Sequence, residues 1–362
     1  MYEELKELFF SLLEVDSPSG FEEPMIRRLM TLLEPLCDEV YQTPRGNVVG
    51  VQRGTDPDAP KVALAAHMDQ VGFVVFNIDP RGFIRFRKLG GAVDRSIQGH
   101  QVKILTEKDP IVGVVGLKPG HITRPEEARQ IPPIEEMYID IGARSPEECA
   151  DRGVKVGTPI VWNTRPVELG NGLVATAAAD DRAGLAAILT VARNLKDRRI
   201  PATVYYIGTV EEENGLRGAA VAAYDLDVDM AVAVDTCAAG WQPDVNMRDL
   251  LYEIGEGPCM QIGEFSSGGL RLESQVVRRW LREAADANGL PYQTGFQHGG
   301  TDASALQQTR SGLPAVAFSV PRRYSHSPVE VLSMGDLHNL AEILTHALSG
   351  LRRGFSTLRV QR

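Results

Sequence analysis

The spacing of apolar positions changes twice along the chain, and the first part has the period of helices. Apolar residues recur at helical spacing over Met1–Leu13 and again over Glu22–Leu36, so both segments are predicted helices. The Ser-, Pro- and Gly-containing segment Asp16–Gly20 predicts a break between them. The short apolar run Lys61–His67 predicts a buried parallel strand with polar chemistry at its carboxyl end.

Between residues 70 and 164 the pattern changes to short β-rich runs separated by Gly and Pro turn signals. These runs cover residues 71–78, 83–87, 101–105, 111–117 and 138–142. One helix is predicted in this region, where Ser145 and Pro146 form a capping signal and Gly153 ends the segment. Short, evenly spaced strands favour a small barrel or sandwich.

From Pro166 onward, strands and helices alternate again. Strands are predicted over Ala202–Thr209, Asp229–Asp235, Tyr292–Gln297 and Ala315–Val320. Helices are predicted from Asp181, over Gly218–Tyr224, over Leu272–Asn288 and near the C-terminus. The order predicts an α/β domain over residues 1–69 and 165–362, interrupted by an inserted β-rich domain over residues 70–164.

Composition and charge narrow the classes of function. The 362 residues contain 38 Lys and Arg against 48 Asp and Glu, a net charge of −10, which argues against a general nucleic-acid binder or a binder of acidic membranes. The four cysteines form no C-x-x-C pair, so neither a zinc ribbon nor a redox dithiol is indicated. A long chain with so few cysteines does not need disulfide bonds, which fits a reducing compartment. Because no run approaches the ~20 apolar residues of a membrane span and the N-terminus lacks a signal-peptide pattern, we expect a cytoplasmic protein.

Acidic residues and histidines stand at the ends of several predicted strands. They are His67 with Asp69, Asp180 with Asp181, Glu211–Glu213, Asp235 and His326. Each has an ordinary explanation by itself: a hydrogen-bonded histidine, a helix cap or a solvated charge run. Together they share one location, the carboxyl edge of a parallel sheet, where sites in open α/β folds gather. Burying several carboxylates there is costly unless cations compensate them, and two divalent metal ions would do so.

The order and spacing of motifs along essentially the whole chain resemble the tetrahedral aminopeptidase family. The motifs are A-H-M-D-Q-V-G (66–72), D-D-R-A-G (180–184), E-E-E-N-G-L-R-G-A (211–219), A-V-D (233–235), G-G-T-D-A (299–303) and Y-S-H-S-P-V-E (324–330). That family comprises dinuclear metallo-aminopeptidases of the glutamyl, leucyl and lysyl, or deblocking, type. The resemblance implies a mixed-sheet α/β di-metal exopeptidase domain with an inserted, barrel-like dimerisation domain.

The resemblance also implies the metal ligands. His67 and Asp235 would hold one divalent ion, Glu213 and His326 would hold the other, and Asp180 would bridge the two. Imidazole and carboxylate ligands suit Zn²⁺ or Co²⁺, and a bridging carboxylate reduces the repulsion between the ions.

Further roles follow from the same resemblance. Glu212 would be the general base that deprotonates a metal-bridging water and passes the proton to the leaving amine. Asp69 would accept the second ring N–H of His67 and fix its tautomer. A cis peptide bond is implied between Asp180 and Asp181, and Glu211 has no matching catalytic role.

A glycine-rich turn is the candidate for substrate binding. Gly299, Gly300, Thr301 and Asp302 follow a predicted strand, and backbone approach to a substrate would require glycine there. The ordinary explanation is a tight turn. His298 stands where relatives often have another glycine, which leaves the shape of the pocket open.

Other functions remain open at this stage. One alternative is a related di-metal exopeptidase or amide deacylase, such as a carboxypeptidase. A carboxypeptidase would need Arg or Lys for the terminal carboxylate of its substrate, and arginines lie near the motifs at positions 182, 217, 322 and 323. Paired carboxylates also occur in glycosidases, although sugar hydrolysis does not need strand-end histidines. A catalytically silent scaffold would be expected to lose Glu212 or Asp180, and both are present.

The partners implied by the resemblance are short peptides with a free N-terminus and further copies of the chain. In that family the inserted domain pairs chains into dimers, and the dimers join into a hollow tetrahedral dodecamer. Composition and periodicity do not themselves indicate the number of subunits, the metal or the preferred N-terminal residue.

Overall fold

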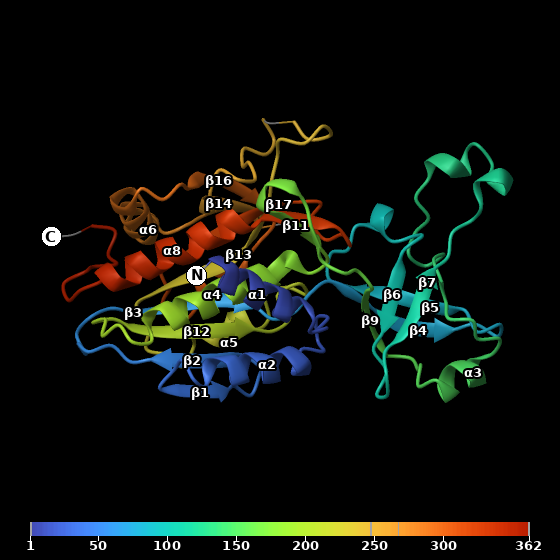
Figure 1. Ribbon diagram of the computed structural model, residues 1–362, viewed down its shortest axis with the longest axis horizontal. Helices are drawn as coiled ribbons and strands as arrows, with labels where there is room; N and C mark the ends of the chain where they lie inside the picture. Colours follow the sequence, from blue (N-terminus) through green and yellow to red (C-terminus); the bar gives the residue numbers. More distant parts are fainter. Residues whose placement is uncertain (1, 247, 267, 361–362) are drawn as a thin grey trace.

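Two lobes of different size make up the chain in the computed structural model (Figure 1). The structure describes residues 2–246, 248–266 and 268–360, so Met1, which belongs to the first predicted helix, lies outside the described residues. The larger lobe contains both ends of the described chain, and the smaller lobe is formed by the middle of the sequence (Figure 1). In the described residues, no helix is both long and apolar enough to span a membrane.

Among the described residues, 12 strands of the larger lobe form one mixed sheet. They are β1 (Glu39–Gln42), β2 (Val48–Gln52), β3 (Lys61–His67), β10 (Val167–Glu168), β11 (Leu173–Thr176), β12 (Thr203–Thr209), β13 (Met230–Ala238), β14 (Cys259–Ser266), β15 (Gly269–Leu272), β16 (Gln293–His298), β17 (Ala315–Arg323) and β18 (Glu330–Ser333). The main path runs β1-β2-β12-β3-β13-β17-β18-β11-β10. Its centre, β12-β3-β13-β17, is parallel, and the strands on either side pair antiparallel.

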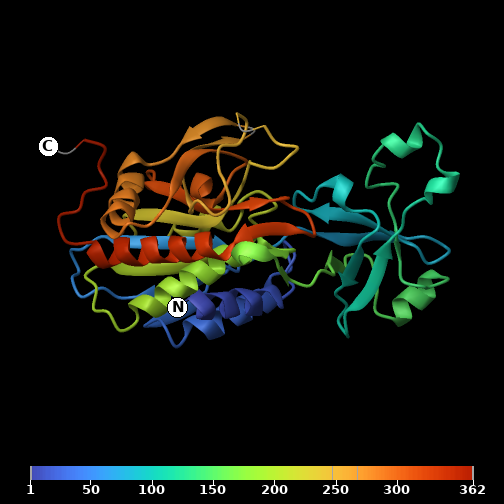
Figure 2. The same cartoon turned by 45° about the horizontal axis from the view of Figure 1, so that its top comes forward.

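Helices cover both faces of this sheet. They are α1 (Tyr2–Leu13), α2 (Glu23–Leu33), α4 (Ala179–Leu195), α5 (Ala219–Ala222), α6 (Gln275–Asn288), α7 (Asp302–Leu306) and α8 (Met334–Gly350). On one face α1, α4 and α8 pack against one another, as Figure 2 shows, and α5 and α7 lie on the other. Strand β3 explains the continuous apolar run, because Leu64 joins the core of the first face and Ala63 and Ala65 join the core of the second.

The smaller lobe is a closed antiparallel barrel with its own core. Its strands are β4 (Gly72–Ile78), β5 (Ile84–Leu89), β6 (Gln101–Ile104), β7 (Ile111–Val115), β8 (Ile139–Asp140) and β9 (Pro159–Trp162), in the order β4-β5-β8-β7-β6-β9, and α3 (Pro146–Asp151) lies beside them. Phe73 is at the centre of this core, with its ring edge-on to Phe86 at 5.2 Å and to Trp162 at 5.0 Å. The predicted fold class, a mixed α/β sheet with a barrel-like insertion, is therefore confirmed. The exact limits of the inserted domain, residues 70–164, stay a prediction.

Several element bounds differ from the predictions. Leu272 ends β15 instead of starting a helix, and α6 begins at Gln275 because the Ser274 side chain accepts a hydrogen bond from the N–H of Val277. The second helix ends at Leu33. Strands β9, β10, β11, β14, β15 and β18 were not predicted. Short 3₁₀ turns cover Asp94–Ser96, Gly120–Ile122, Glu127–Arg129 and Gly170–Gly172.

Because the barrel has a core of its own, we expect damage to that core to stay local. Phe73→Ala should cost about 3–5 kcal/mol of barrel stability, as large-to-small core substitutions typically do. Hydrogen exchange measured by mass spectrometry should then speed up in peptides covering β5–β7, while peptides from α4 and α8 keep their protection. Equal loss of protection in both lobes would contradict two separate cores.

Candidate metal centre

The predicted ligand residues come from elements that meet at one end of the parallel strands. His67 ends β3, Asp235 lies in β13, and Glu213 follows β12, the neighbour of β3. Asp180 lies at the start of α4, where the backbone is not yet helical. Parallel neighbours bring their carboxyl ends to the same edge, which is why residues so far apart in sequence converge here.

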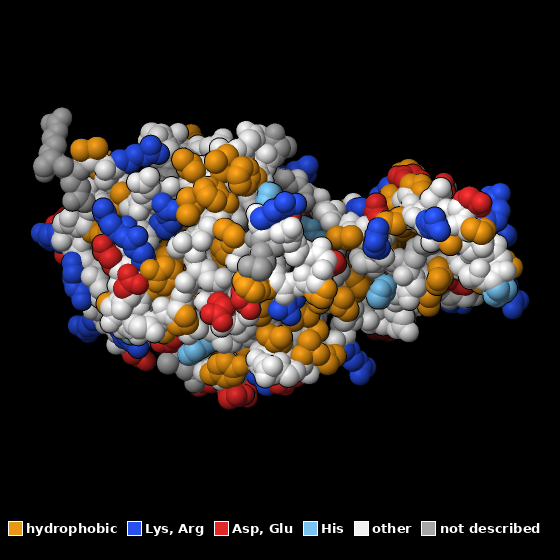
Figure 3. Space-filling view, turned by 90° about the horizontal axis from the view of Figure 1, so that it is seen from above, with side chains coloured by type: hydrophobic (Ala, Val, Ile, Leu, Met, Phe, Trp, Pro, Cys, Tyr) orange, Lys and Arg blue, Asp and Glu red, His pale blue; other side chains and the backbone are white. Residues whose placement is uncertain are grey.

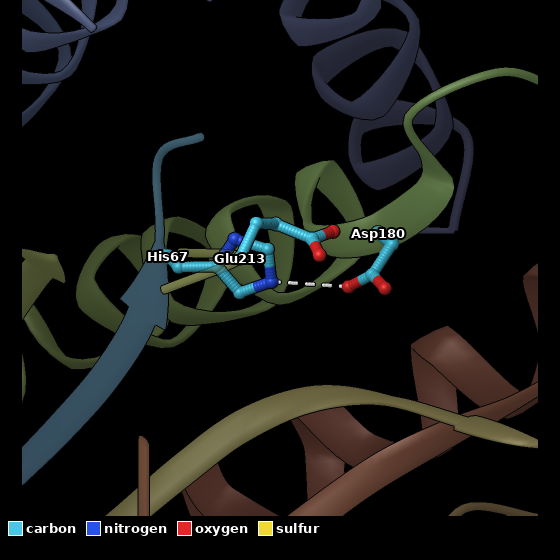
Figure 4. Close-up of side chains that lie close together, drawn as sticks. All are labelled: His67, Asp180 and Glu213. Atoms are coloured by element: carbon cyan, nitrogen blue, oxygen red, sulfur yellow. Dashed lines mark hydrogen bonds and ion pairs between the residues drawn. The ribbon is translucent and has the colours of Figure 1, made fainter. Parts of the chain in front are cut away.

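A first group of side chains surrounds the carboxylate of Asp180. One ligand atom each from His67, Asp180 and Glu213 lies within 4.8 Å of the others, and Figure 4 shows these side chains pointing toward one another. His67 Nε2 lies 3.0 Å from Asp180 Oδ1. His326 Nε2 lies 3.3 Å from Asp180 Oδ2 and 3.5 Å from Glu213 Oε1. The two oxygens of Asp180 therefore face different histidines, as a bridging carboxylate would.

A second group adjoins the first through His67. Ligand atoms of His67, Asp181 and Asp235 also lie within 4.8 Å of one another. Asp181 had no predicted role; it is buried, and its Oδ2 has no hydrogen-bond partner in the described residues. The peptide bond between Asp180 and Asp181 is cis, as the resemblance implies.

Asp69 supports both sides of this cluster. His67 Nδ1 lies 3.1 Å from the Asp69 carbonyl oxygen and 3.5 Å from its carboxylate. A proton on Nδ1 leaves the lone pair of Nε2 available for a metal ion. The Asp69 carboxylate accepts the main-chain N–H groups of Glu212 at 2.9 Å and Glu213 at 3.1 Å. The prediction gave the contact with the His67 ring to the Asp69 carboxylate, but the main-chain oxygen of Asp69 lies nearer to the ring. The carboxylate instead fixes the loop that carries Glu212 and Glu213.

The electrostatics of the cluster are those of a cation site. Burial raises the pKa of Glu212 and of Asp235 well above the ordinary value, and it raises the pKa of Glu213 to about 7. At Asp180 burial acts in the same direction, but Arg322 and the two histidines hold the pKa of this carboxyl well below its usual range. The buried Glu213 Oε1 has no hydrogen-bond partner among the described residues. A donor set of carboxylates and imidazoles with unsatisfied oxygens fits divalent metal ions.

The cluster opens into a cavity of about 460 Å³. Asp180, Glu212, Glu213, Asp235 and His326 all line it. No hydrogen bond to the described part of the chain engages the side chain of Glu212, so its carboxylate is available to a substrate. The lining also includes Ser266, Arg271, Gln297, His298, Gly299 and Gly300.

The glycine-rich turn divides into two parts. Gly299 and Gly300 line the cavity, as a substrate-binding turn would. Thr301 and Asp302 are buried and engaged elsewhere: the Thr301 hydroxyl donates to Glu264, and Asp302 accepts from the Thr209 hydroxyl. Thr301 also caps α7 by accepting the N–H of Ala303. The side-chain contacts of Thr301 and Asp302 are those expected of a tight turn that begins a helix.

The barrel lobe contributes one wall of the cavity through the segment that follows β5. His326 Nδ1 lies 3.2 Å from the carbonyl oxygen of Gly91, which lines the cavity. The N–H of Gly90 donates to Asn214, next to Glu213, at 3.1 Å. A Cβ on Gly91 would lie 2.8 Å from His326 Nδ1, so a larger residue there would displace the His326 ring.

Two residues at the cluster were not assigned roles from the sequence. The buried guanidinium of Arg322 pairs with the carboxylates of Asp180 and Glu330. Glu330 also accepts the main-chain N–H groups of Asp180 at 3.2 Å and His326 at 2.8 Å. The available signal was a charged residue directly before the apolar pair Val331 and Leu332, at the end of the last motif.

Comparison with known proteins agrees with the fold. Residues 46–343 match the model of the M42 glutamyl aminopeptidase family. The chain is similar to the lysyl aminopeptidase of Pyrococcus furiosus, with 33% identity over 349 residues that cover 96% of this chain and 97% of the relative.

Solved structures show the same relationship. Aminopeptidase APDkam598 from the archaeon Desulfurococcus kamchatkensis superposes with a TM-score of 0.91 at 32% identity, covering 96% of this chain and 95% of the other. The TET1 peptidase of Pyrococcus horikoshii, described as assembling into a tetrahedron or a large octahedral shell, gives a TM-score of 0.84 at 30% identity, covering 96% of this chain and 100% of the other. The resemblance found in the sequence is thereby confirmed, and this chain belongs to the M42 glutamyl aminopeptidase family.

Proposed function

We propose that this peptide hydrolase removes N-terminal residues from short, unblocked peptides with the help of two divalent metal ions. The observation that carries the proposal is the position of Asp180, whose two carboxylate oxygens face His67 and His326 beside Glu213 in one cavity. His67 and Asp235 would hold one ion, and Glu213 and His326 the other. Zn²⁺ and Co²⁺ are the ions that these ligands suit.

Glu212 is proposed as the general base. When bound, the ions supply Lewis acidity to the peptide carbonyl and to the attacking water. Glu212 accepts the proton of that water and delivers it to the leaving amine. Its place in the cavity supports this role, and so does the bond from its main-chain N–H to Asp69, which fixes the loop.

The carboxypeptidase alternative needs a free cation at the site. Arg182 is buried and donates to Met68, Ser17 and Gln70. Arg217 pairs with Glu211 outside the cavity lining, and Arg322 is engaged by Asp180 and Glu330. These contacts leave none of the three arginines free for a substrate carboxylate, and the family favours the aminopeptidase. Arg271 also lines the cavity, so a comparison of free with N-acetylated peptides is the direct test.

Assembly into dimers and then into a tetrahedral dodecamer is proposed from the family and from the barrel surface. Strand β7 alternates buried and exposed positions, and Val112 and Val114 are 53% and 45% exposed. In Figure 3 hydrophobic side chains reach the surface on both lobes. An apolar outward face on a barrel strand suits contact with a second copy. The cytoplasmic location stays a prediction.

Metal content gives the first test. Protein prepared without chelator should carry about two equivalents of divalent metal, as in co-catalytic sites. His326→Ala should lose one of them, whereas His346→Ala, which changes a histidine next to Glu342 on α8, should keep both. Full activity after exhaustive chelation, measured with aminoacyl chromogenic substrates, would refute the metal centre.

The second test separates the base from the ligands. Glu212→Gln should lower kcat by about two to four orders of magnitude, the usual effect of losing a general base, and leave metal content unchanged. The matched control is Glu211→Gln, because the Glu211 carboxylate pairs with Arg45 and Arg217. A Glu212→Gln enzyme with near wild-type kcat would assign the base to another residue.

Light scattering tests the assembly in the presence of Zn²⁺ or Co²⁺. The wild-type mass should be a multiple of the 39.6 kDa of one chain. Val112→Asp with Val114→Asp should reduce it by placing charge on the apolar barrel face, and Val221→Asp on α5 serves as control. A wild-type mass of 39.6 kDa would refute dimer and dodecamer alike, and twice that mass would refute only the dodecamer.

A further inference from the structure

The carboxylate of Glu330 joins two segments that carry proposed metal ligands. Glu330 opens β18 and is only 1% exposed. Its Oε2 accepts the main-chain N–H of Asp180 at 3.2 Å, and its Oε1 accepts the main-chain N–H of His326 at 2.8 Å. One side chain therefore fixes the backbone at two ligands that are far apart in sequence.

The main chain at Asp180 and at His326 needs a hydrogen-bond acceptor from another part of the chain. The N–H groups in the first turn of a helix have no acceptor within the helix, and Asp180 lies at the irregular start of α4. His326 has a φ of 57°, a left-handed conformation that is unfavourable for a residue with a Cβ. Such conformations persist only where the surroundings hold them. Glu330 supplies an acceptor at each of these places.

Arg322 balances the buried charge of Glu330 and extends the same connection. Its Nη1 donates to Glu330 Oε1 at 2.9 Å, its Nη2 donates to the Asp180 carboxylate, and its Nε donates to the hydroxyl of Thr236, the neighbour of Asp235. All of these groups are buried. The pair thus links β17 and β18 to the segments that carry Asp180, Asp235 and His326.

We propose that Glu330, paired with Arg322, is a positioning residue that holds Asp180 and His326 at the separation a metal ion requires, an inference that rests on the proposed metal centre. Glu330 does not line the cavity and both of its oxygens already accept N–H donors, so it is not itself a ligand. Partners that orient ligands in this way typically account for a 10–100-fold effect on metal affinity. Without Glu330, the two ligand segments lose their common anchor, and Arg322 keeps only Asp180 as a carboxylate partner.

The experiment measures Co²⁺ binding to the full-length protein by competition with a chelator, together with the visible absorption of bound Co²⁺. Glu330→Gln should weaken Co²⁺ binding about 10–100-fold and change the absorption spectrum. Glu330→Asp keeps the charge but is one methylene shorter and cannot reach both N–H groups. It should therefore weaken binding as well, which separates positioning from charge.

The matched control is Asp336→Asn on α8. Asp336 is also 1% exposed and accepts two main-chain N–H groups, from Gly255 at 2.7 Å and Gly257 at 2.9 Å, but it does not line the cavity. Asp336→Asn should lower the thermal unfolding midpoint and leave Co²⁺ affinity and spectrum at wild-type values.

Two results would overturn the inference. One is wild-type Co²⁺ affinity in Glu330→Asp, which also remains decisive if Glu330→Gln does not fold. The other is an equal loss of affinity in Asp336→Asn, which would indicate general loosening of the fold. A wild-type protein that binds no Co²⁺ would instead refute the metal centre itself, so the two failures are distinguishable.

Discussion

The structure depends on how negative charge is balanced at the end of a parallel sheet. Asp180, Asp181, Glu212, Glu213 and Asp235 are carboxylates drawn from different elements into one largely buried place. An isolated buried carboxylate is strongly unfavourable, so such a group persists only with cations around it. The histidines and the Arg322 guanidinium supply part of the balance within the chain. The negative charge that these groups leave unbalanced is what suits the site to metal ions. The order of the strands in the sheet brings the carboxylates together.

The fold could be predicted from the sequence where burial leaves a clear pattern. Lys61–His67 is apolar throughout because β3 has helices on both faces, and the barrel followed from short β-rich runs with turn signals. Prediction failed where one apolar residue fits two elements. Leu272 satisfies helical spacing with the residues after it, yet it pairs with Gly263 in a hairpin, and only the cap at Ser274 marks the change. Strand β9 shows no alternation because its last three residues are all buried.

The site was predictable to the level of residue type and strand end, and no further. His67, Asp180 and Glu213 stand in motifs whose order could be matched, and the structure brings them together. What the sequence does not contain is which main-chain N–H a carboxylate reaches. The hydrogen bonds of Glu330 to two distant segments depend on the pairing of β18 with β11 and β17. In the same way, Thr301 is buried away from the cavity because its hydroxyl bonds to Glu264 on β14.

The approach of Gly91 to His326 has a consequence for how this protein can diverge. The barrel looks like a separable module, since it has its own core and joins the larger lobe through few connections (Figure 2). Yet the segment after β5 completes the wall around His326, and a side chain at Gly91 would collide with that ring. The outer barrel strands can therefore change in sequence without affecting the site. The segment after β5 is constrained because it contacts His326. A recombination that swapped the whole insertion would have to keep glycine at position 91, or it would displace the His326 ring.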